Sequence, residues 1–385
     1  MIIGIDIRML AQGTRSGIEE YTINLLSNMI SLDNNIEYKL FYNGYKKTEL
    51  EYDFLKLSNV QLKEFKIPNR ILDASFQFLN YPKIDKMLEK VDVFFSPHIF
   101  SSSLSKKCRT ITTFHDLSFE SYPEFYSTGK NYWHFLMNPR KQARKADQII
   151  AVSKSTKDDL INIYNIKPEK IKVIYSGIDQ ESRIKNQESR ISKIKKRYNL
   201  PDRYILYLGT LEPRKNIIGL IKAFEILNSR FKIPDSKFQL IIAGSKGWLY
   251  NDIFKTVENS PVKNDIVFTG FVDNKDKSAL YSLADLFVYP SFYEGFGFPP
   301  LEAMAAGTPV VTSNFSSLPE AVGDAAIMVN PYNLDELAKG MEMVLTDEKL
   351  KNILIERGLE QIKKFSWQKC ARETLKFMLN NREVF

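Results

Sequence analysis

Residues 284–311 read ADLFVYPSFYEGFGFPPLEAMAAGTPVV, and this stretch indicates a strand, a glycine loop, a helix and a second strand. The apolar run 284–290 predicts a short buried strand, and the glycines that follow let the backbone approach a ligand closely. Pro299 and Pro300 suit the first turn of a helix, where a missing N–H costs nothing. Gly307 and Pro309 end that helix before a new strand begins at Val310. The stretch is therefore one unit of an alternating α/β protein.

Two carboxylates flank the start of this predicted helix. Glu294 lies in the loop before the helix, and Glu302 lies inside it. The N–H groups at a helix N-terminus bind anions, so a phosphate or diphosphate is the expected ligand. However, strand–loop–helix units occur in every doubly wound protein and a glutamate on a helix is usually solvated. The spacing alone therefore leaves a structural role open.

Length and composition set the scale of the protein. The 385 residues suggest two domains of ordinary size, and a hydrophobic content of 44% supports full-sized cores. The net charge is +8; residues 1–180 carry 25 basic and 21 acidic side chains, and residues 181–200 carry 7 and 2. This uneven surplus favours an acidic surface or a phosphorylated ligand. Because no repeat of aromatic and basic residues occurs, we expect no nucleic-acid partner.

The cysteines and histidines suggest no metal or disulfide framework. Cys108 and Cys370 lie far apart, and the three histidines lack a zinc spacing. A reducing cytoplasm fits this pattern. The first residues read as a strand and not as a signal peptide, and no apolar run approaches the roughly 18 residues of a membrane span.

Short apolar runs alternate with amphipathic segments along the chain, which predicts parallel, doubly wound sheets. Two such halves meet near residues 176–202. We expect helices at 18–31, 155–164, 334–345 and 350–365, with Ser153 and Ser155 as candidate caps of the second. The predicted strands are 2–6, 38–42, 60–65, 93–95, 110–114, 148–152, 171–175, 204–208, 239–243, 266–269, 286–289, 310–312 and 326–329.

A basic pair follows the strand that ends at Gly209. Arg214 and Lys215 precede a predicted helix that starts near Asn216. Cationic side chains beside a helix N-terminus neutralise the charge of a leaving diphosphate. The alternative for an isolated basic pair is a solvated loop.

Other strand ends carry weaker signals. His115 closes a predicted strand and can hydrogen-bond a sugar hydroxyl or a developing charge, although a lone histidine there is more often structural. The loop 13–17 lacks the Gly-x-Gly-x-x-Gly pattern, and no Walker-type Gly-Lys-Ser/Thr motif occurs. The sequence alone presents the loop at Gly270 and Phe271 as a simple connection.

The full string around Glu294 and Glu302 resembles the carboxylate motif of the family-4 retaining glycosyltransferases. The shared pattern is Glu, seven residues, Glu, with Gly-Phe-Gly after the first and EAMAAGTPVV over the second, and the resemblance extends over most of the chain. It implies an α/β protein of the GT-B fold, with two facing Rossmann-like doubly wound domains. These are an acceptor-binding domain at 1–180, a nucleotide-sugar-binding domain at 181–365, and a C-terminal helix at 366–385 that returns to the first domain.

The resemblance also implies roles for individual residues. Lys215 matches the lysine of the family's phosphate clamp, but Thr210 stands where many relatives have an arginine, so Arg214 is the expected substitute. Ser176 also departs, since Asn is common there. The implied catalytic residues are His115, Glu294 and Lys215. The implied donor-binding residues are Gly17, Arg214, Lys215, Gly270, Phe271, Gly295, Phe296, Gly297, Leu301 and Glu302.

In this assignment Glu302 binds the ribose, Glu294 contacts the sugar and His115 steadies it. The basic pair and the N–H groups near Gly297 hold the diphosphate. No Asp-x-Asp motif occurs, so we expect no metal and no cofactor, with the basic residues and the helix dipole in place of a cation. No carboxylate nucleophile is evident on the acceptor side, which favours front-face attack with retention.

We therefore expect a retaining hexosyltransferase that moves a sugar from a nucleotide-sugar donor to a glycan or lipid-linked acceptor in cell-surface polysaccharide synthesis. The string GTLEPRKN at 209–216 resembles bacterial mannosyltransferases of polysaccharide assembly, so GDP-mannose is the first expected donor. UDP- and dTDP-sugars stay open. The alternative functions are a nucleotide-sugar epimerase of the same fold and a non-catalytic sugar-nucleotide-binding subunit; the intact Glu pair argues against the second.

The expected location is the cytoplasm, with peripheral contact to the anionic inner face of the membrane. Two basic clusters are candidates for that contact, and for both the alternative is an ordinary solvated helix. The clusters are Arg140, Lys141, Arg144 and Lys145, and Lys193, Lys195, Lys196 and Arg197.

Overall fold

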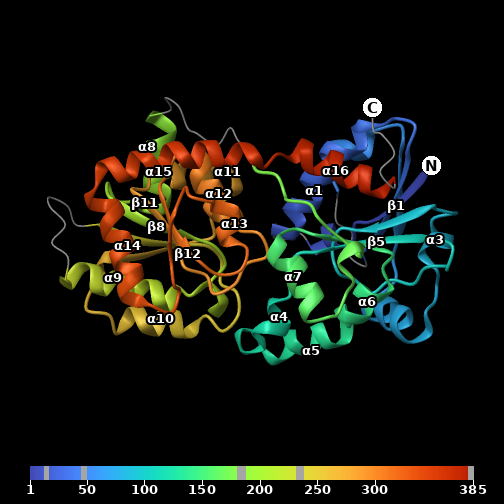
Figure 1. The fold of residues 1–385 in the computed structure, drawn as a ribbon, viewed down its shortest axis with the longest axis horizontal. Helices are drawn as coiled ribbons and strands as arrows, with labels where there is room; N and C mark the ends of the chain where they lie inside the picture. Colours follow the sequence, from blue (N-terminus) through green and yellow to red (C-terminus); the bar gives the residue numbers. More distant parts are fainter. Residues whose placement is uncertain (13–16, 45–49, 180–187, 231–237, 380–385) are drawn as a thin grey trace. The chain divides into compact units, whose positions relative to one another are not determined.

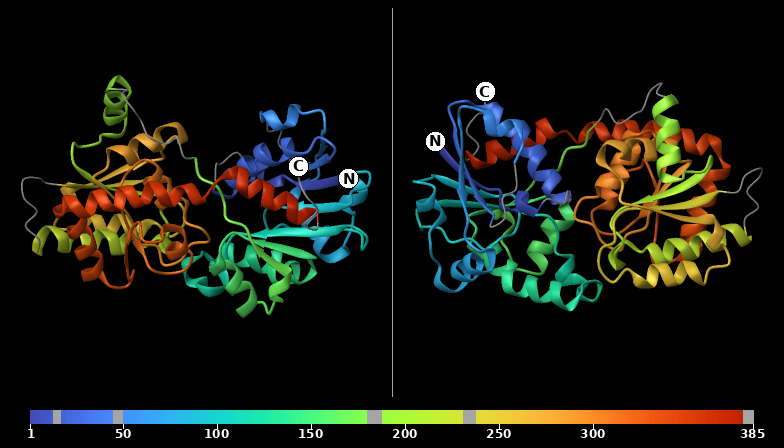
Figure 2. Two further views of the ribbon diagram at one scale, coloured as in Figure 1. Left: turned by 45° about the horizontal axis from the view of Figure 1, so that its top comes forward. Right: turned by 180° about the vertical axis from the view of Figure 1, so that it is seen from behind.

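The computed structural model describes residues 1–12, 17–44, 50–179, 188–230 and 238–379. The chain forms two compact units. The first consists of Met1–Leu117, Gly129–Gly177 and Ser366–Phe385, and the second of Ser118–Thr128 and Ile178–Phe365. Each unit has one parallel sheet with helices on both faces (Figures 1 and 2). Residues 13–16 of the predicted loop 13–17, and residues 180–187 of the predicted connection near 176–202, lie outside the described residues.

The first unit contains a seven-stranded sheet in the order β3-β2-β1-β4-β5-β6-β7. Every neighbouring pair is parallel, as the alternating sequence predicted. The strands are β1 (Ile2–Asp6), β2 (Glu37–Asn43), β3 (Val60–Phe65), β4 (Val93–Ser96), β5 (Arg109–Phe114), β6 (Gln148–Ala151) and β7 (Ile171–Val173).

The second unit repeats this plan with six parallel strands in the order β10-β9-β8-β11-β12-β13. They are β8 (Tyr204–Leu208), β9 (Gln239–Ala243), β10 (Ile266–Gly270), β11 (Leu286–Tyr289), β12 (Val310–Ser313) and β13 (Ile327–Val329). The predicted doubly wound α/β class is thus confirmed for both units.

Within the part of the chain that the structure describes, sixteen α-helices connect and cover the two sheets. Those of the first unit are α1 (Gly17–Met29), α2 (Asn69–Ala74), α3 (Ile84–Met87), α5 (Thr128–Met137), α6 (Pro139–Lys145), α7 (Lys154–Asn162) and α16 (Trp367–Met378). Those of the second unit are α4 (Ser118–Ser121), α8 (Glu188–Tyr198), α9 (Ile217–Arg230), α10 (Asn251–Glu258), α11 (Asn274–Leu283), α12 (Phe298–Ala305), α13 (Leu318–Val322), α14 (Leu334–Thr346) and α15 (Glu348–Gln361). Of the two candidate caps, it is Ser153 that caps α7, by accepting a hydrogen bond from the N–H of Thr156.

The last helix, α16, packs against α1 of the first unit. Ser366 caps α16, and the ring of Trp367 lies 6.0 Å from that of Tyr21 on α1. Gly177 allows the chain to pass this point, because a β-carbon there would come within 2.2 Å of the backbone nitrogen of Trp367. The described residues contain no helix that is long and apolar enough to span a membrane.

The segment Ser118–Thr128 groups with the second unit, although the sequence analysis placed the whole of 1–180 in the first domain. Aromatic contacts account for this. The Phe125 ring stacks on Phe292 with centroids 5.3 Å apart, and the Trp248 indole N–H donates to the Phe125 carbonyl at 2.6 Å.

Each sheet has one point at which the strand order reverses: between β1 and β4 in the first unit, and between β8 and β11 in the second. The loops that leave two such strands diverge to opposite faces of the sheet and open a crevice at their carboxyl ends. Residues just after these four strands are therefore placed to meet a ligand.

Candidate active site

A buried lysine and a buried glutamate meet after strands β8 and β11. Lys215 ends a short 3-10 helix (Pro213–Lys215) that follows β8 in the chain, and Glu294 lies in the loop that follows β11. The Lys215 Nζ lies 2.6 Å from Glu294 Oε1 and donates a second hydrogen bond to the Tyr289 hydroxyl at 2.8 Å. Only 7% of each residue is exposed, so the ion pair is shielded from solvent.

Arg214 completes this cluster from the opposite side of Glu294. Its Nη1 lies 3.1 Å from Glu294 Oε2 and donates to the Tyr293 carbonyl at 2.7 Å. Its Nε and Nη2 both donate to Glu212 Oε1, at 3.1 and 2.8 Å. Two cations and two carboxylates thus balance in charge within one network.

This network keeps Glu294 ionised. Burial alone would raise the pKa of its carboxyl group, but the charges of Lys215 and Arg214 outweigh burial and lower the pKa to about 2. The main chain is also fixed, since the Glu294 N–H donates to Ser316 Oγ at 2.8 Å and its carbonyl accepts from Ser317 Oγ at 2.9 Å. Glu294 is therefore a rigid anion.

The helix α12 begins directly after this loop, as the sequence predicted. Gly297 precedes it with φ of +104°, a left-handed conformation that favours glycine, and a β-carbon there would meet the Leu318 side chain at 2.9 Å. Pro299 occupies the first turn. The glycine supplies no side chain to cover the helix N-terminus, and such an end carries partial positive charge.

Glu302 lies within α12 and is half-buried. Its Oε2 accepts a hydrogen bond from the Tyr281 hydroxyl at 2.8 Å. Tyr281 is buried on α11, with its ring edge-on to Phe287 at 5.1 Å. Tyr281 contacts only Oε2, and the described residues provide no hydrogen-bond partner for Glu302 Oε1, which leaves Oε1 for a ligand.

The remaining predicted donor residues fall into two groups. Gly270 has φ of +72° and nothing within 4 Å of its β position, and Phe271 beside it is 64% exposed, so both can meet a ligand. In contrast, Leu301 is fully buried and the Phe296 ring packs edge-on against Phe298 and Phe365, at 5.1 and 5.5 Å. The side chains of Leu301 and Phe296 thus form core, and a ligand can reach only the backbone there. Gly295 is buried in the same loop.

His115 and Gly17 lie in the first unit, whereas the other predicted site residues lie in the second. Gly17 begins α1, and its β position faces open space. His115 follows β5 and its Nε2 lies 2.8 Å from the Pro97 carbonyl oxygen. A carbonyl only accepts, so Nε2 carries the proton and Nδ1 holds a lone pair. Burial lowers the pKa of His115, which keeps the ring neutral.

Three site residues escaped the sequence analysis. Glu212 holds Arg214, Tyr289 holds Lys215, and Tyr281 holds Glu302. Glu212 stood inside the inspected string after β8, so its position near the basic pair was the available signal. The two tyrosines look like ordinary core residues in the sequence. Within the described ranges, no group of three or more His, Cys, Asp or Glu is placed to hold a metal ion.

Comparisons with known proteins identify the family of the chain. The model of the glycosyl transferases group 1 matches residues 188–361, and that of glycosyltransferase family 4 matches residues 15–182. The O-antigen chain mannosyltransferase B of Escherichia coli is 35% identical over 269 residues, which are 69% of each chain. The serotype-specific mannosyltransferase WbdA of Escherichia coli is 31% identical over 362 residues, 91% of this chain but 44% of that protein. The chain thus spans less than half the length of WbdA.

A solved structure supports the fold class. Sucrose-phosphate synthase from Thermosynechococcus elongatus has a TM-score of 0.78 over 98% of both chains, at 19% sequence identity. At that identity the likeness concerns the fold alone. Together with the two matched family models, it confirms the predicted GT-B class.

Proposed function

Since the chain belongs to the group 1 and family 4 glycosyltransferases, we propose that it is a retaining, metal-independent enzyme that transfers mannose from GDP-mannose. The acceptor is a glycan or a lipid-linked glycan in cell-surface polysaccharide synthesis. That the chain is a hexosyltransferase follows from the family. The choice of mannose rests on the names of the two Escherichia coli relatives, both mannosyltransferases.

The observation that carries this proposal is the buried cluster of Lys215, Arg214 and Glu294 beside the start of α12. A donor diphosphate brings negative charge to this point, and Lys215 and the N-terminus of α12 are the groups that bind it. Arg214 is held by Glu212, Glu294 and the Tyr293 carbonyl, so we assign it chiefly to bracing Glu294. When Lys215 turns towards a phosphate, Glu294 gains a free oxygen for a sugar hydroxyl.

Glu302 and Phe271 are assigned to the nucleoside. Glu302 is held by Tyr281 through one oxygen, which leaves the other for the ribose hydroxyls. Phe271 is exposed after β10, beside Gly270, and offers an aromatic face to the base. This assignment keeps all contacts to the nucleotide within the second unit.

The same residues support the proposal of metal independence and retention. Lys215 supplies a positive charge where another enzyme would use a divalent cation. In the proposed step the bond from the anomeric carbon to the phosphate oxygen breaks while the acceptor oxygen bonds to the same face. The acceptor proton passes to the leaving phosphate oxygen. Neutral His115 holds a sugar hydroxyl through the lone pair of Nδ1.

The test is the reaction itself, with an α-mannoside acceptor and GDP-mannose in the presence of excess EDTA. We expect transfer with retained anomeric configuration, read by NMR of the product. A product that forms without acceptor would indicate the alternative epimerase. Full loss of activity in EDTA, restored by Mg²⁺ or Mn²⁺, would contradict metal independence.

We also propose peripheral contact with an anionic membrane through the basic face of α6, defined as Arg140, Lys141, Arg144 and Lys145. All four residues are exposed. The second basic cluster is less suited, because Arg197 pairs with Asp273 and Asp276 and Lys195 pairs with Asp202. Each free basic side chain at an anionic surface contributes about 1 kcal/mol.

A further inference from the structure

A buried asparagine joins the loop of Lys215 to the loop of Glu294. Asn216 follows Lys215 directly in the chain and is only 7% exposed. Its side-chain Nδ2 donates to the Pro331 carbonyl at 2.7 Å and to the Pro290 carbonyl at 3.2 Å. Pro290 is the first residue after β11, and Pro331 lies in the loop after β13. One amide therefore connects the chain that follows β8 to the loops that follow two other strands of the sheet.

Both protons of the Asn216 amide are used in these contacts. A carbonyl oxygen only accepts hydrogen bonds, so it is the NH₂ group that faces the two proline carbonyls, and each of its protons meets one of them. Pro290 and Pro331 are buried, like Asn216 itself. Removing the amide would take a hydrogen bond from two buried acceptors at once, which is costly.

The backbone of Asn216 is also fixed. Its φ of +55° lies in the left-handed region, which asparagine adopts more readily than most residues other than glycine. Its N–H donates to the Pro213 carbonyl at 3.0 Å, and its own carbonyl accepts from the N–H of Leu220 at 3.1 Å. Asn216 is therefore held by its main chain at the point where α9 begins.

Gly219 leaves room for the amide of Asn216. It lies in the first turn of α9 and is buried. A β-carbon at Gly219 would lie 2.3 Å from Asn216 Oδ1 and 2.8 Å from both Cγ and Nδ2. No alanine fits there unless the amide moves away from the two proline carbonyls. Because glycine is less favourable than alanine inside a helix, the space that Asn216 needs accounts for a glycine at this position.

The contacts of Asn216 differ in kind from the ion pair beside them. Lys215 and Glu294 attract one another across 2.6 Å. In the proposed reaction Lys215 turns towards the diphosphate, and this attraction then no longer holds the loop of Glu294. The hydrogen bonds of the Asn216 amide do not depend on that charge. A second uncharged contact between the same two loops runs from the N–H of Phe292 to the Arg214 carbonyl, at 2.9 Å.

We propose that Asn216 is a positioning residue for the transfer reaction, which keeps Glu294 in place at the sugar when Lys215 binds the diphosphate. This inference rests on the proposed function, because it takes Lys215 and Glu294 to contact the donor. The nucleoside is assigned to other elements, to Glu302 on α12 and to Phe271 after β10. Loss of the Asn216 amide should therefore lower kcat and leave the affinity for GDP nearly unchanged.

The test compares Asn216→Gly, Gly219→Ala and the double variant in the full chain. Asn216→Gly keeps a residue that adopts the left-handed backbone and removes the amide. We expect kcat for transfer from GDP-mannose to an α-mannoside to fall about 10²-fold, the typical effect of a displacement of about 1 Å in an active site. Gly219→Ala should lower kcat as well, because it displaces the amide. Calorimetry should show nearly native affinity for GDP in both variants.

The double variant identifies the contact that carries the effect. Without an amide to displace, Gly219→Ala should cause no further loss of kcat in the Asn216→Gly background. Its effect on urea unfolding should also change sign, from destabilising beside Asn216 to stabilising beside glycine, because alanine is the better helix residue. Asn199→Gly is the matched control. Asn199 also has a left-handed backbone, with φ of +51°, but it is exposed after α8, so kcat should stay native.

Three results would overturn the proposal. They are a native kcat in Asn216→Gly, equal losses of kcat and of GDP affinity, as a general loosening of the second unit would give, and additive effects of the two substitutions. A native protein that neither binds GDP nor transfers mannose would refute the proposed function instead. The contact of the Asn216 amide with the two loops is then judged by the unfolding experiment alone, in which the absence of the sign change counts against it.

Discussion

Replacing Lys215 with methionine should destabilise the second unit as well as abolish most turnover. Methionine keeps the length and the apolar stem of the side chain but removes the charge. Native Lys215, Arg214, Glu212 and Glu294 balance as two cations and two anions. Lys215→Met leaves one buried carboxylate in excess, and the 2.6 Å contact to Glu294 and the 2.8 Å contact to Tyr289 are lost.

The contacts give the size of the effect. Removing one partner of a buried ion pair typically costs 3–5 kcal/mol, because the other charge stays buried and uncompensated. Arg214 remains 3.1 Å from Glu294, so we expect about 3 kcal/mol, the low end of that range. Loss of one electrostatic contact to the leaving group should also lower the transfer rate by about 10²–10³.

A double-mutant cycle by urea unfolding at pH 7 measures this effect. Glu294→Gln alone leaves one cation in excess, but Lys215→Met with Glu294→Gln restores the balance between Arg214 and Glu212. The loss of unfolding free energy in the double variant should therefore be smaller than the sum of the losses in the two single variants. Glu302→Gln is the matched control, since Glu302 is held by Tyr281 and should not couple to Lys215.

The pH dependence of stability provides a second test of the Lys215–Glu294 ion pair. Native Glu294 has a lowered pKa, so its contribution to stability is full above pH 4.5 and is lost as the pH falls towards 2. Without Lys215 the folded-state pKa rises, and protonation then relieves the buried charge. The stability deficit of Lys215→Met relative to the native protein should be smaller at pH 5 than at pH 7. Strictly additive single effects, or a deficit equal at both pH values, would refute the charge-balance argument.

Further predictions follow from other contacts. Glu302→Gln should weaken GDP binding by roughly 1.5–3 kcal/mol, because it removes the charge of the carboxylate. Tyr281→Phe should weaken GDP binding by less, because it removes only the hydrogen bond that holds this carboxylate. Unchanged calorimetric affinity in Glu302→Gln would remove Glu302 from the donor site. Burial lowers the pKa of His98 to about 3 and that of His134 to about 4, compared with 6.5 for an unperturbed histidine. Between these values the unfolded state binds more protons than the folded state, so the melting temperature should fall as the pH falls from 7 to 4. The decrease should be smaller in His98→Phe. Binding to anionic vesicles should decrease with salt and with neutralisation of the basic face of α6, as read by co-sedimentation; salt-independent binding would argue against it.

Much of the fold was predictable because the signal is local. A short apolar run indicates a buried parallel strand, and apolar residues at helical spacing indicate a helix. Strands such as Ile2–Asp6 and Tyr204–Leu208 were therefore predicted with their observed bounds. The carboxylate pair was placed correctly as well. Proline in the first turn of α12 and glycine before it marked where the helix begins, so the sequence placed Glu294 in the loop and Glu302 in the helix.

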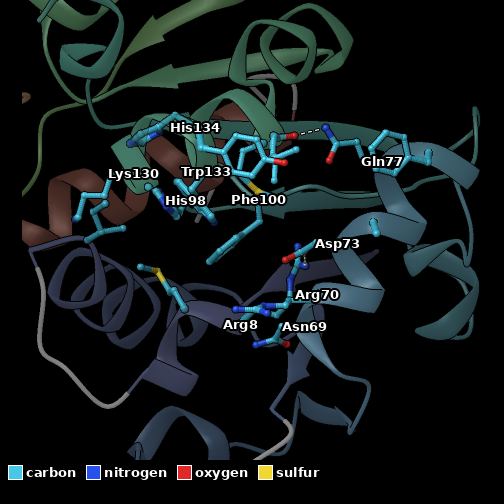
Figure 3. Close-up of a pocket in the computed structure, with 18 residues that line it drawn as sticks. Arg8, Asn69, Arg70, Asp73, Gln77, His98, Phe100, Lys130, Trp133 and His134 are labelled. Atoms are coloured by element: carbon cyan, nitrogen blue, oxygen red, sulfur yellow. Dashed lines mark hydrogen bonds and ion pairs between the residues drawn. The ribbon is translucent and has the colours of Figure 1, made fainter. Parts of the chain in front are cut away.

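What the sequence could not show depends on distant contacts. Tyr281 and Glu302 lie 21 positions apart, and nothing local marks that hydrogen bond. The segment Ser118–Thr128 groups with the second unit through aromatic packing between rings more than a hundred positions apart. A pocket of the first unit that is lined by His98 draws on five separate segments of the chain, none of which carries a recognisable motif (Figure 3).

The two units use the same strand order for different chemistry. In the second, the loops after β8 and β11 bring charged groups together, and Glu294 is kept ionised by Lys215 and Arg214. In the first, the loops after β1 and β4 bring Arg8 and His98 to a pocket in which the arginine is neutralised and the histidine is uncharged. A charged cluster beside a helix N-terminus suits a diphosphate, whereas the pocket of the first unit mixes aromatic rings with the charged side chains of Arg70, Asp73 and Lys130. The sheet topology therefore accounts for where each group of residues lies, and the residues in the loops determine the chemistry of each group.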